Sequence, residues 1–306
     1  MAGSGHGTRA IIAAFLANLG IAISKSIGFV ITGSASMLAE AVHSVADTGN
    51  QALLLLGGRR ARREPSELHP FGYGRERYFW AFVVALVLFS LGSVFAIYEG
   101  LNKLDHPEAV ESPVVNYVIL GVAIVLEAFS FRTAIHESNL VRGTLSWPRF
   151  VRRAKTPELP VVLLEDLGAL LGLMIALAAL ITAEATGEPI WDGVGTVTIG
   201  VLLGVIAIFL AIEMKGLLIG EAADLEVQDK IRRAVESDPN VARLIHFRTQ
   251  HLGPEELLVA AKVQFADGLS GAGLADAVDQ VEAAIRAEVP IAELIYLEPD
   301  VAREPA

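Results

Sequence analysis

The chain has no cysteine among its 306 residues, so it cannot form a disulfide, a thiolate metal ligand or a thiol nucleophile. Charged residues are also scarce, at 19% against about 25% in ordinary soluble domains. Basic residues number 24 and acidic residues 35, which gives a formal net charge of −11. A nucleic acid is excluded as a partner, because binding a phosphate backbone needs an excess of Lys and Arg.

Apolar residues are abundant and fall in long blocks. They make up 53% of the chain, and the mean hydropathy is +0.51. A hydrocarbon core of about 30 Å requires about 20 mostly apolar residues per helix. Six stretches meet this length: Arg9–Thr32, Ser36–Gly57, Tyr78–Leu101, Pro113–Ile135, Leu159–Thr182 and Trp191–Glu213. The pattern predicts an all-α membrane protein of six transmembrane helices surrounded by lipid. The first block is too long for a cleavable signal peptide, so we expect none.

The composition changes to that of a soluble domain near Met214, and this tail carries most of the net negative charge. We therefore expect a six-helix transmembrane domain at 1–213 and a second, soluble domain at 214–306. Periodicity predicts, in order, a helix, two strands, a helix and a strand, at Glu226–Ser237, Arg243–Gln250, Leu257–Phe265, Ser270–Glu288 and Glu293–Leu297. The two middle strands are separated by a turn at 251–254. This α-β-β-α-β order favours an open-faced α/β sandwich that serves in dimerisation or regulation.

Basic residues are concentrated in two of the connections between apolar blocks, and the other connections hold only Lys103. One is the loop Arg59–Arg77 and the other is Arg142–Lys155. Because Lys and Arg accumulate on the cytoplasmic side of a membrane, both loops are predicted to be cytoplasmic. With an even number of spans, the N- and C-termini are cytoplasmic too. We expect residence in a bacterial inner (plasma) membrane.

Ionisable residues lie inside several of the apolar blocks, where each costs about 2.5–3.5 kcal/mol at the helix centre. His43 and Asp47 are four residues apart, so an imidazole and a carboxylate share one helix face and can bind one cation. Glu165 and Asp166 lie in the fifth block. The depths of the two helices are compatible, and we expect His43, Asp47 and Asp166 to converge on one metal ion.

A structural role for these charges stays open. Lys25 and Glu127 also lie in apolar blocks and can form an ion-pair network with the other charges. A protonated Lys25 cannot bind a metal. Glu40 lies near the outer end of its block, where a solvated carboxylate is equally acceptable. Lys25, Glu40 and Glu127 are therefore candidates for structural or proton-coupling roles.

The segments Thr32–Asp47 and His69–Arg75 (His-Pro-Phe-Gly-Tyr-Gly-Arg) resemble the cation diffusion facilitator family, as does the order of six spans and an α/β tail. The resemblance implies a homodimeric exporter that exchanges zinc or a related divalent ion for protons. It places the first ligand pair on His43 and Asp47 and the second on Val162 and Asp166. Because Val162 cannot bind metal, either Glu165 or water completes the site, and we favour Glu165.

The resemblance also implies two secondary metal sites, which are incomplete in this chain. In the loop, His69 is retained, but Tyr73 replaces a second His. In the tail, His246 is retained, and His251 is a possible substitute for a missing ligand. The other positions carry Lys262, Tyr296 and Glu298. A lysine opposes cation binding, so the tail is expected to serve mainly in dimer contacts.

Zinc is the favoured cargo, because a small site of nitrogen and oxygen ligands suits it. Manganese, iron, cobalt and cadmium remain open. The chain is not expected to be an enzyme, since it has neither a His-Glu-x-x-His element nor a Gly-x-Ser-x-Gly elbow. Two alternatives remain: a membrane metalloenzyme that uses the same His and carboxylates, and a non-transporting membrane scaffold.

Overall fold

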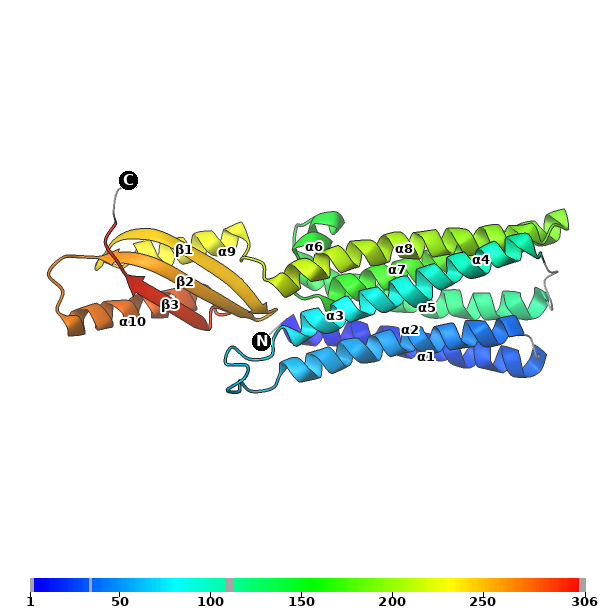
Figure 1. The fold of residues 1–306 in the computed structure, drawn as a ribbon, viewed down its shortest axis with the longest axis horizontal. Helices are drawn as coiled ribbons and strands as arrows, with labels where there is room; N and C mark the ends of the chain where they lie inside the picture. Colours follow the sequence, from blue (N-terminus) through cyan, green and yellow to red (C-terminus); the bar gives the residue numbers. More distant parts are fainter. Residues whose placement is uncertain (1–2, 33–34, 108–112, 303–306) are drawn as a thin grey trace. The chain divides into compact units, whose positions relative to one another are not determined.

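The computed structural model describes residues 3–32, 35–107 and 113–302. The chain divides into two compact units, each described here by itself (Figure 1). The helical unit comprises residues 1–60 and 77–215, and the tail unit comprises residues 61–76 and 216–306. The sequence-based division placed the loop 61–76 with the helices, whereas the structure groups it with the tail.

Long apolar helices build the helical unit, and they follow the predicted blocks closely. They are α1 (Gly3–Thr32), α2 (Ala35–Ala61), α3 (Glu76–Val87), η1 (Leu88–Val94), α4 (Phe95–Asp105), α5 (Pro113–Arg142), α7 (Glu158–Thr186) and α8 (Ile190–Ile219). In the described part of the chain, five helical stretches are long and apolar enough to cross a membrane: Thr8–Ile31, Glu76–Asp105, Val114–Arg142, Glu158–Thr186 and Ile190–Ile219. Helix α2 is continuous over 27 residues, but its polar residues make it less apolar than these five.

The third apolar stretch contains a π-helical segment that the sequence does not predict. Segment η1 runs from Leu88 to Val94 between α3 and α4, and the three elements form one uninterrupted helical rod. A π-helical turn widens the helix and changes the direction of the side chains that follow it. Within this segment Ser93 is buried against α8, where a Cβ at Gly204 would lie 2.6 Å from the Ser93 hydroxyl oxygen.

Glycines allow the helices to approach one another closely, as is common between membrane helices. A Cβ added to Gly100 of α4 would lie 2.6 Å from the backbone nitrogen of Val197 in α8. On α8, a Cβ at Gly200 would meet Ile97 at 2.7–2.8 Å. Leu126 of α5 similarly packs over Gly20 of α1. These small residues set how closely the helices pack.

Gly100→Ala is expected to destabilise the helical unit by about 1–3 kcal/mol, because backbone atoms of α8 must move to make room for the methyl group. Thermal unfolding of the purified protein in detergent measures this loss. Gly121→Ala on α5 is the matched control, since nothing lies within 4 Å of its Cβ position. Equal stability of the two variants would show that the α4–α8 contact is looser than described.

A short helix that the sequence does not predict precedes α7. Helix α6 (Trp147–Arg153) has Pro148 in its first turn and buries Phe150 and Val151. The guanidinium of Arg142 lies 4.3 Å from the centre of the Trp147 ring. This cation–π contact joins the end of α5 to the start of α6.

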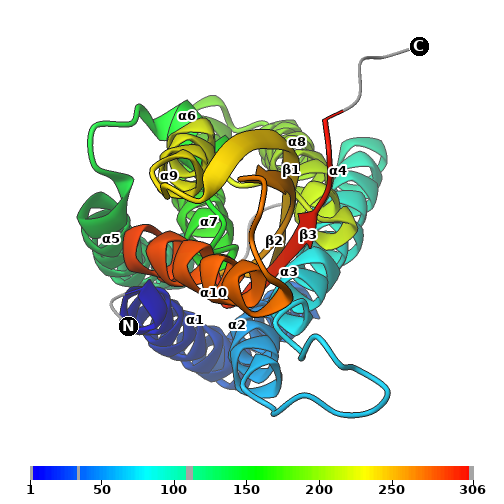
Figure 2. The ribbon, with the colours of Figure 1, turned by 90° about the vertical axis from the view of Figure 1, so that its left-hand side faces the viewer.

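The tail unit contains, in order, α9 (Leu225–Glu236), β1 (Val241–Gly253), β2 (Glu256–Phe265), α10 (Gly271–Glu288) and β3 (Leu294–Pro299). The sheet order is β1-β2-β3, with β1 antiparallel and β3 parallel to β2. Alternate residues of β2, from Leu257 to Phe265, are buried, so only one face of the sheet is covered. Helices α9 and α10 lie on that side, and their apolar residues complete the core (Figure 2).

Strand β1 is longer than the sequence predicts. The expected strand ended at Gln250, with a turn at 251–254, but β1 continues to Gly253 and pairs with Glu256. Leu252 is buried, and the backbone N–H of His251 donates to the carbonyl of Glu221. Packing and hydrogen bonding therefore extend the strand, and the turn is reduced to Pro254 and Glu255.

The loop 61–76 contacts the β1–β2 turn within the tail unit. A Cβ at Gly74 would lie 2.8 Å from the carbonyl oxygen of Leu252 and 3.0 Å from the Cα of Gly253. Only a residue without a side chain permits this approach. Within the loop, the hydroxyl groups of Ser66 and Tyr73 are 3.0 Å apart. These contacts explain why the loop groups with the tail.

Candidate metal site

Helix α2 presents a continuous row of polar residues. Asn50 and Gln51 follow Asp47 by three and four residues and so lie one turn further along its side of the helix, and the sequence spacing puts His43 one turn before Asp47. Asp47 is half-buried, whereas Asn50 and Gln51 are buried. The side chains of Glu40 and His43 lie outside the described part of the structure. The expected position of the His43 imidazole therefore stays a prediction.

Glu165 of α7 is buried and faces this row. Its Oε1 accepts a hydrogen bond from Asn50 Nδ2 at 3.2 Å, and its Oε2 accepts one from Gln51 Nε2 at 2.6 Å. These bonds bring α2 and α7 together at the level of the predicted site. Asn50 and Gln51 were not among the residues expected from the sequence. The continued polar spacing after Asp47 is the signal that identifies them.

Asp166, the next residue of α7, is held by a different helix. Its Oδ2 accepts a hydrogen bond at 2.6 Å from the hydroxyl of Ser130 on α5. Both residues are buried. Sequence reasoning missed Ser130, because a serine in an apolar helix usually bonds to its own backbone. The two adjacent carboxylates of α7 thus face two different neighbours.

Glu127, one turn before Ser130 on α5, is a further buried carboxylate. Its charge interacts with those of Asp47, Glu165 and Asp166, and with the positive charge of Lys25 on α1. The helical unit therefore gathers one half-buried carboxylate and three buried ones near Lys25. Like charges at this depth repel one another strongly, so the cluster favours a bound cation or protons.

The ligand set expected from the sequence is placed only in part. Asp47 and Asp166 both lie in the cluster, but no three described His, Asp or Glu side chains form a group that could hold a metal ion. Val162, where the resemblance implies a ligand, is fully buried and apolar. Convergence of His43, Asp47 and Asp166 on one ion remains a prediction.

The residues expected to form two secondary metal sites lie in the tail unit. His69 is exposed, and its ring centre lies 4.6 Å from that of Tyr73. His246 is exposed on β1, opposite Lys262 on β2. His251 is buried, with Nδ1 3.3 Å from the carbonyl oxygen of Gly253. No group of three metal-binding side chains is found in the described part of this unit.

Lys262 forms ion pairs with two acidic residues at the edge of the sheet. Its Nζ lies 2.9 Å from Asp300 Oδ2 and 3.0 Å from Glu298 Oε1. The hydrogen bond to Asp300, followed by that to Glu298, raises the pKa of Lys262 above its ordinary value. The lysine therefore stays positively charged at neutral pH, and its charge opposes a metal ion at this position.

A buried ion pair joins the first turns of α3 and α7. Arg77 Nη2 donates to Glu158 Oε2 at 2.8 Å, and Arg77 Nε donates to Glu158 Oε1. Both side chains are largely shielded from solvent. Glu158 precedes Glu165 by seven residues, so the two share a face of α7 two turns apart. The pair fixes α7 at the end nearest the carboxylate cluster.

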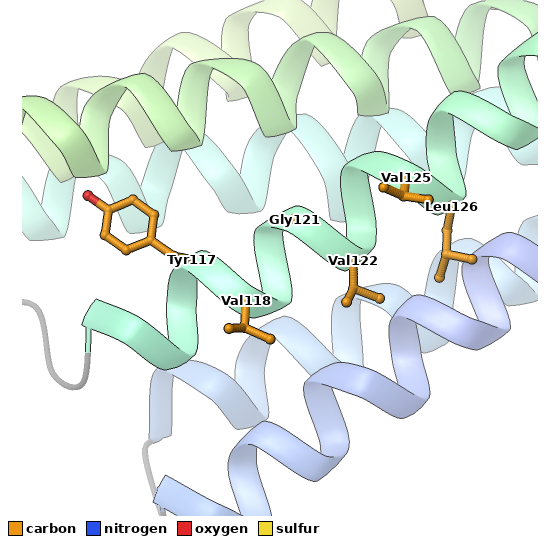
Figure 3. A pocket seen from close by; sticks show the side chains of 6 residues that line it. All are labelled: Tyr117, Val118, Gly121, Val122, Val125 and Leu126. Carbon is orange, nitrogen blue, oxygen red and sulfur yellow. The ribbon is translucent and has the colours of Figure 1, made fainter.

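A groove of about 410 Å³ lies along the N-terminal half of α5. Its lining residues are Tyr117, Val118, Gly121, Val122, Val125 and Leu126 (Figure 3). In the view, Val118, Val122 and Leu126 point to the same side of α5, whereas Tyr117 lies on another side. The Tyr117 hydroxyl donates to Glu184 of α7 at 2.7 Å. An apolar lining of this kind does not suit a metal cation.

The chain is similar to a known protein family and to several individual proteins. Residues 11–219 match the family described as the cation efflux transmembrane domain. Proton-coupled zinc antiporter SLC30A9, mitochondrial, of Xenopus laevis is 35% identical over 244 residues, which are 79% of this chain and 44% of that protein. Metal tolerance protein C4 of Arabidopsis thaliana is 33% identical over 263 residues, which are 85% of this chain and 57% of that protein. Zinc transporter ZitB of Escherichia coli (strain K12) is 24% identical over 254 residues, which are 83% of this chain and 76% of that protein. The chain thus spans about half the length of the first two.

Proposed function

The chain belongs to the cation diffusion facilitator family, and from this membership and its buried carboxylates we propose that it exports a divalent metal cation in exchange for protons. Zinc is the favoured cargo. Three of the similar proteins are named for zinc or metal handling, and one of them is named a proton-coupled antiporter.

The carboxylate cluster of α2, α5 and α7 carries the proposal. Asp47, Glu127, Glu165 and Asp166 interact electrostatically inside a unit made of apolar helices. Metal ligands must be deprotonated, so metal ions and protons compete for the same carboxylates. If the helices expose the cluster alternately to each side of the membrane, this competition couples metal export to proton entry.

We propose His43, Asp47 and Asp166 as ligands of the cargo, with Glu165 beside them. One imidazole and two carboxylates provide nitrogen and oxygen ligands, which zinc accepts in a tetrahedral site. Manganese, iron, cobalt and cadmium remain possible cargoes, since ligand type and geometry decide among these metals. Lys25 and Glu127 would balance charge or relay protons.

The test is transport by the purified full chain in liposomes. Zinc uptake accompanied by proton movement in the opposite direction is expected when a pH gradient is imposed. The same measurement with manganese compares the two cargoes. A folded sample that moves neither metal would contradict the proposal and would favour the membrane scaffold instead.

The proposal includes a topology of six spans, with α2 as the second. Both termini and the loop Arg59–Arg77 would then be cytoplasmic, as the positive-inside rule indicates. The tail unit would mediate homodimer contacts. Helix α2 qualifies by length, and its polar residues face the carboxylate cluster of the neighbouring helices.

A cysteine introduced at Ser66 is expected to react with a membrane-impermeant thiol reagent only from the cytoplasmic side. Ser66 is exposed, and the chain has no cysteine of its own, so the labelling has no background. Comparing intact cells with inverted membrane vesicles measures the side of access. Labelling of intact cells would overturn the topology. A cysteine at His106, in the connection after α4, is the opposite control and should be labelled from outside.

A further inference from the structure

Two buried carboxamides of α2 are fixed in orientation by Glu165. Asn50 is 2% exposed and Gln51 is 0% exposed, and each donates its NH₂ group to a different oxygen of the Glu165 carboxylate. Each oxygen of the Glu165 carboxyl group thus accepts from one of these NH₂ groups. The NH₂ ends must therefore face α7, and the carbonyl oxygens are turned away from Glu165.

These carbonyl oxygens have no partner. In the described part of the chain, the buried side-chain polar atoms without a hydrogen bond include Asn50 Oδ1, Gln51 Oε1, Arg75 Nε and Ser138 Oγ. Of these, only the two carboxamide oxygens are pure acceptors. A buried acceptor without a partner is costly, so its persistence calls for an explanation such as a bound ion.

The position of the two oxygens points to the ion. Asn50 and Gln51 follow Asp47 by three and four residues, so they lie one turn further along the same face of α2. Asp47 interacts electrostatically with Glu165, so its charge belongs to the same acidic cluster. Carbonyl oxygens, including those of Asn and Gln, suit hard divalent cations such as Ca²⁺ and Mn²⁺. Two free acceptors thus adjoin an acidic cluster.

We propose that Asn50 Oδ1 and Gln51 Oε1 are ligands of the transported cation, and that Glu165 is a positioning residue which orients them. This inference rests on the function proposed above. It offers a replacement for the ligand missing at Val162, supplied by α2 rather than by α7. It also makes the site richer in oxygen, which suits manganese better than a second imidazole would.

The test is calorimetric titration of the purified full chain in detergent with ZnCl₂ and with MnCl₂. Asn50→Leu and Gln51→Met remove the oxygen while keeping the volume similar. Each is expected to weaken Mn²⁺ binding by about 10–100-fold, with a smaller loss for Zn²⁺, because zinc depends more on the imidazole of His43. Asn18→Leu removes a buried carboxamide from α1 and should leave both affinities unchanged.

Glu165→Gln separates positioning from direct binding. A glutamine at 165 keeps one acceptor for the carboxamides, so a positioning role predicts a smaller loss of affinity than in Asn50→Leu. If Glu165 binds the metal directly, removing its charge should cost more than either carboxamide substitution. That second result would overturn the role assigned to Glu165.

A measurement on the wild-type protein tests the inference even if the substituted variants do not fold. In wild-type protein with side-chain ¹³C-labelled Asn and Gln, bound Mn²⁺ is expected to show a ¹³C hyperfine coupling from the carboxamide carbons. Its absence, or unchanged Mn²⁺ and Zn²⁺ affinities in both carboxamide variants, would overturn the inference while leaving metal transport intact. A wild-type protein that binds neither metal would instead reject the proposed function.

Discussion

Asp47→Ala is expected to abolish metal transport in liposomes, with a rate reduced by at least about 100-fold, the upper range for losing even an indirect contact to a metal. Asp47 lies on α2 among the charges of Glu127 and Glu165. No other described residue of α2 offers a carboxylate at this level, so a neighbour on the helix cannot take its place.

Expression and folding of this variant should be nearly normal, because alanine removes a costly charge from the apolar region together with the ligand. Asp192→Ala on α8 is the matched control: Asp192 pairs with Lys103 at 2.9 Å, away from the carboxylate cluster. It should retain transport. A wild-type transport rate in Asp47→Ala would show that Asp47 is not a ligand of the transported metal.

Glu158→Gln is expected to lower the free energy of unfolding by about 3–5 kcal/mol, since it removes the carboxylate that pairs with Arg77 in a largely buried position. The two residues form a bidentate pair between α3 and α7. Arg77→Met should cost a similar amount, because it leaves the Glu158 carboxylate alone. Chemical or thermal unfolding in detergent measures both.

The double substitution Arg77→Met with Glu158→Gln should recover much of this loss, because no unpaired charge remains. The control is Lys103→Met, which breaks a more exposed pair between α4 and α8 and should cost less than about 1 kcal/mol. Additive effects of the two single substitutions at Arg77 and Glu158 would show that the pair contributes no coupling energy.

Much of the fold could be predicted from the sequence, because hydropathy is a property of consecutive residues. The apolar blocks became helices with ends within several residues of those expected, and the tail helices and strands fell where their periodicity placed them. The polar spacing of His43 and Asp47 on α2, and the adjacent acids of α7, indicated where the charged cluster would form. The membership of the family also followed from motifs along the chain.

Other features depend on interactions that no local pattern reports. The π-helical segment Leu88–Val94, the short helix α6 and the extension of β1 to Gly253 arise from packing against distant elements. The loop 61–76 groups with the tail because Gly74 permits close approach to Gly253. Each of these depends on a neighbour that lies far away in the sequence.

For the candidate site, the sequence by itself determined that ionisable groups lie in apolar helices and which face of α2 carries them, because helical periodicity fixes both. Only the tertiary structure decided that Glu165 accepts a hydrogen bond from Asn50, 115 positions away along the chain, and that Asp166 accepts one from Ser130. The physical reason is that a residue's spacing sets its face on its own helix, whereas the rotation and packing of neighbouring helices set which faces meet.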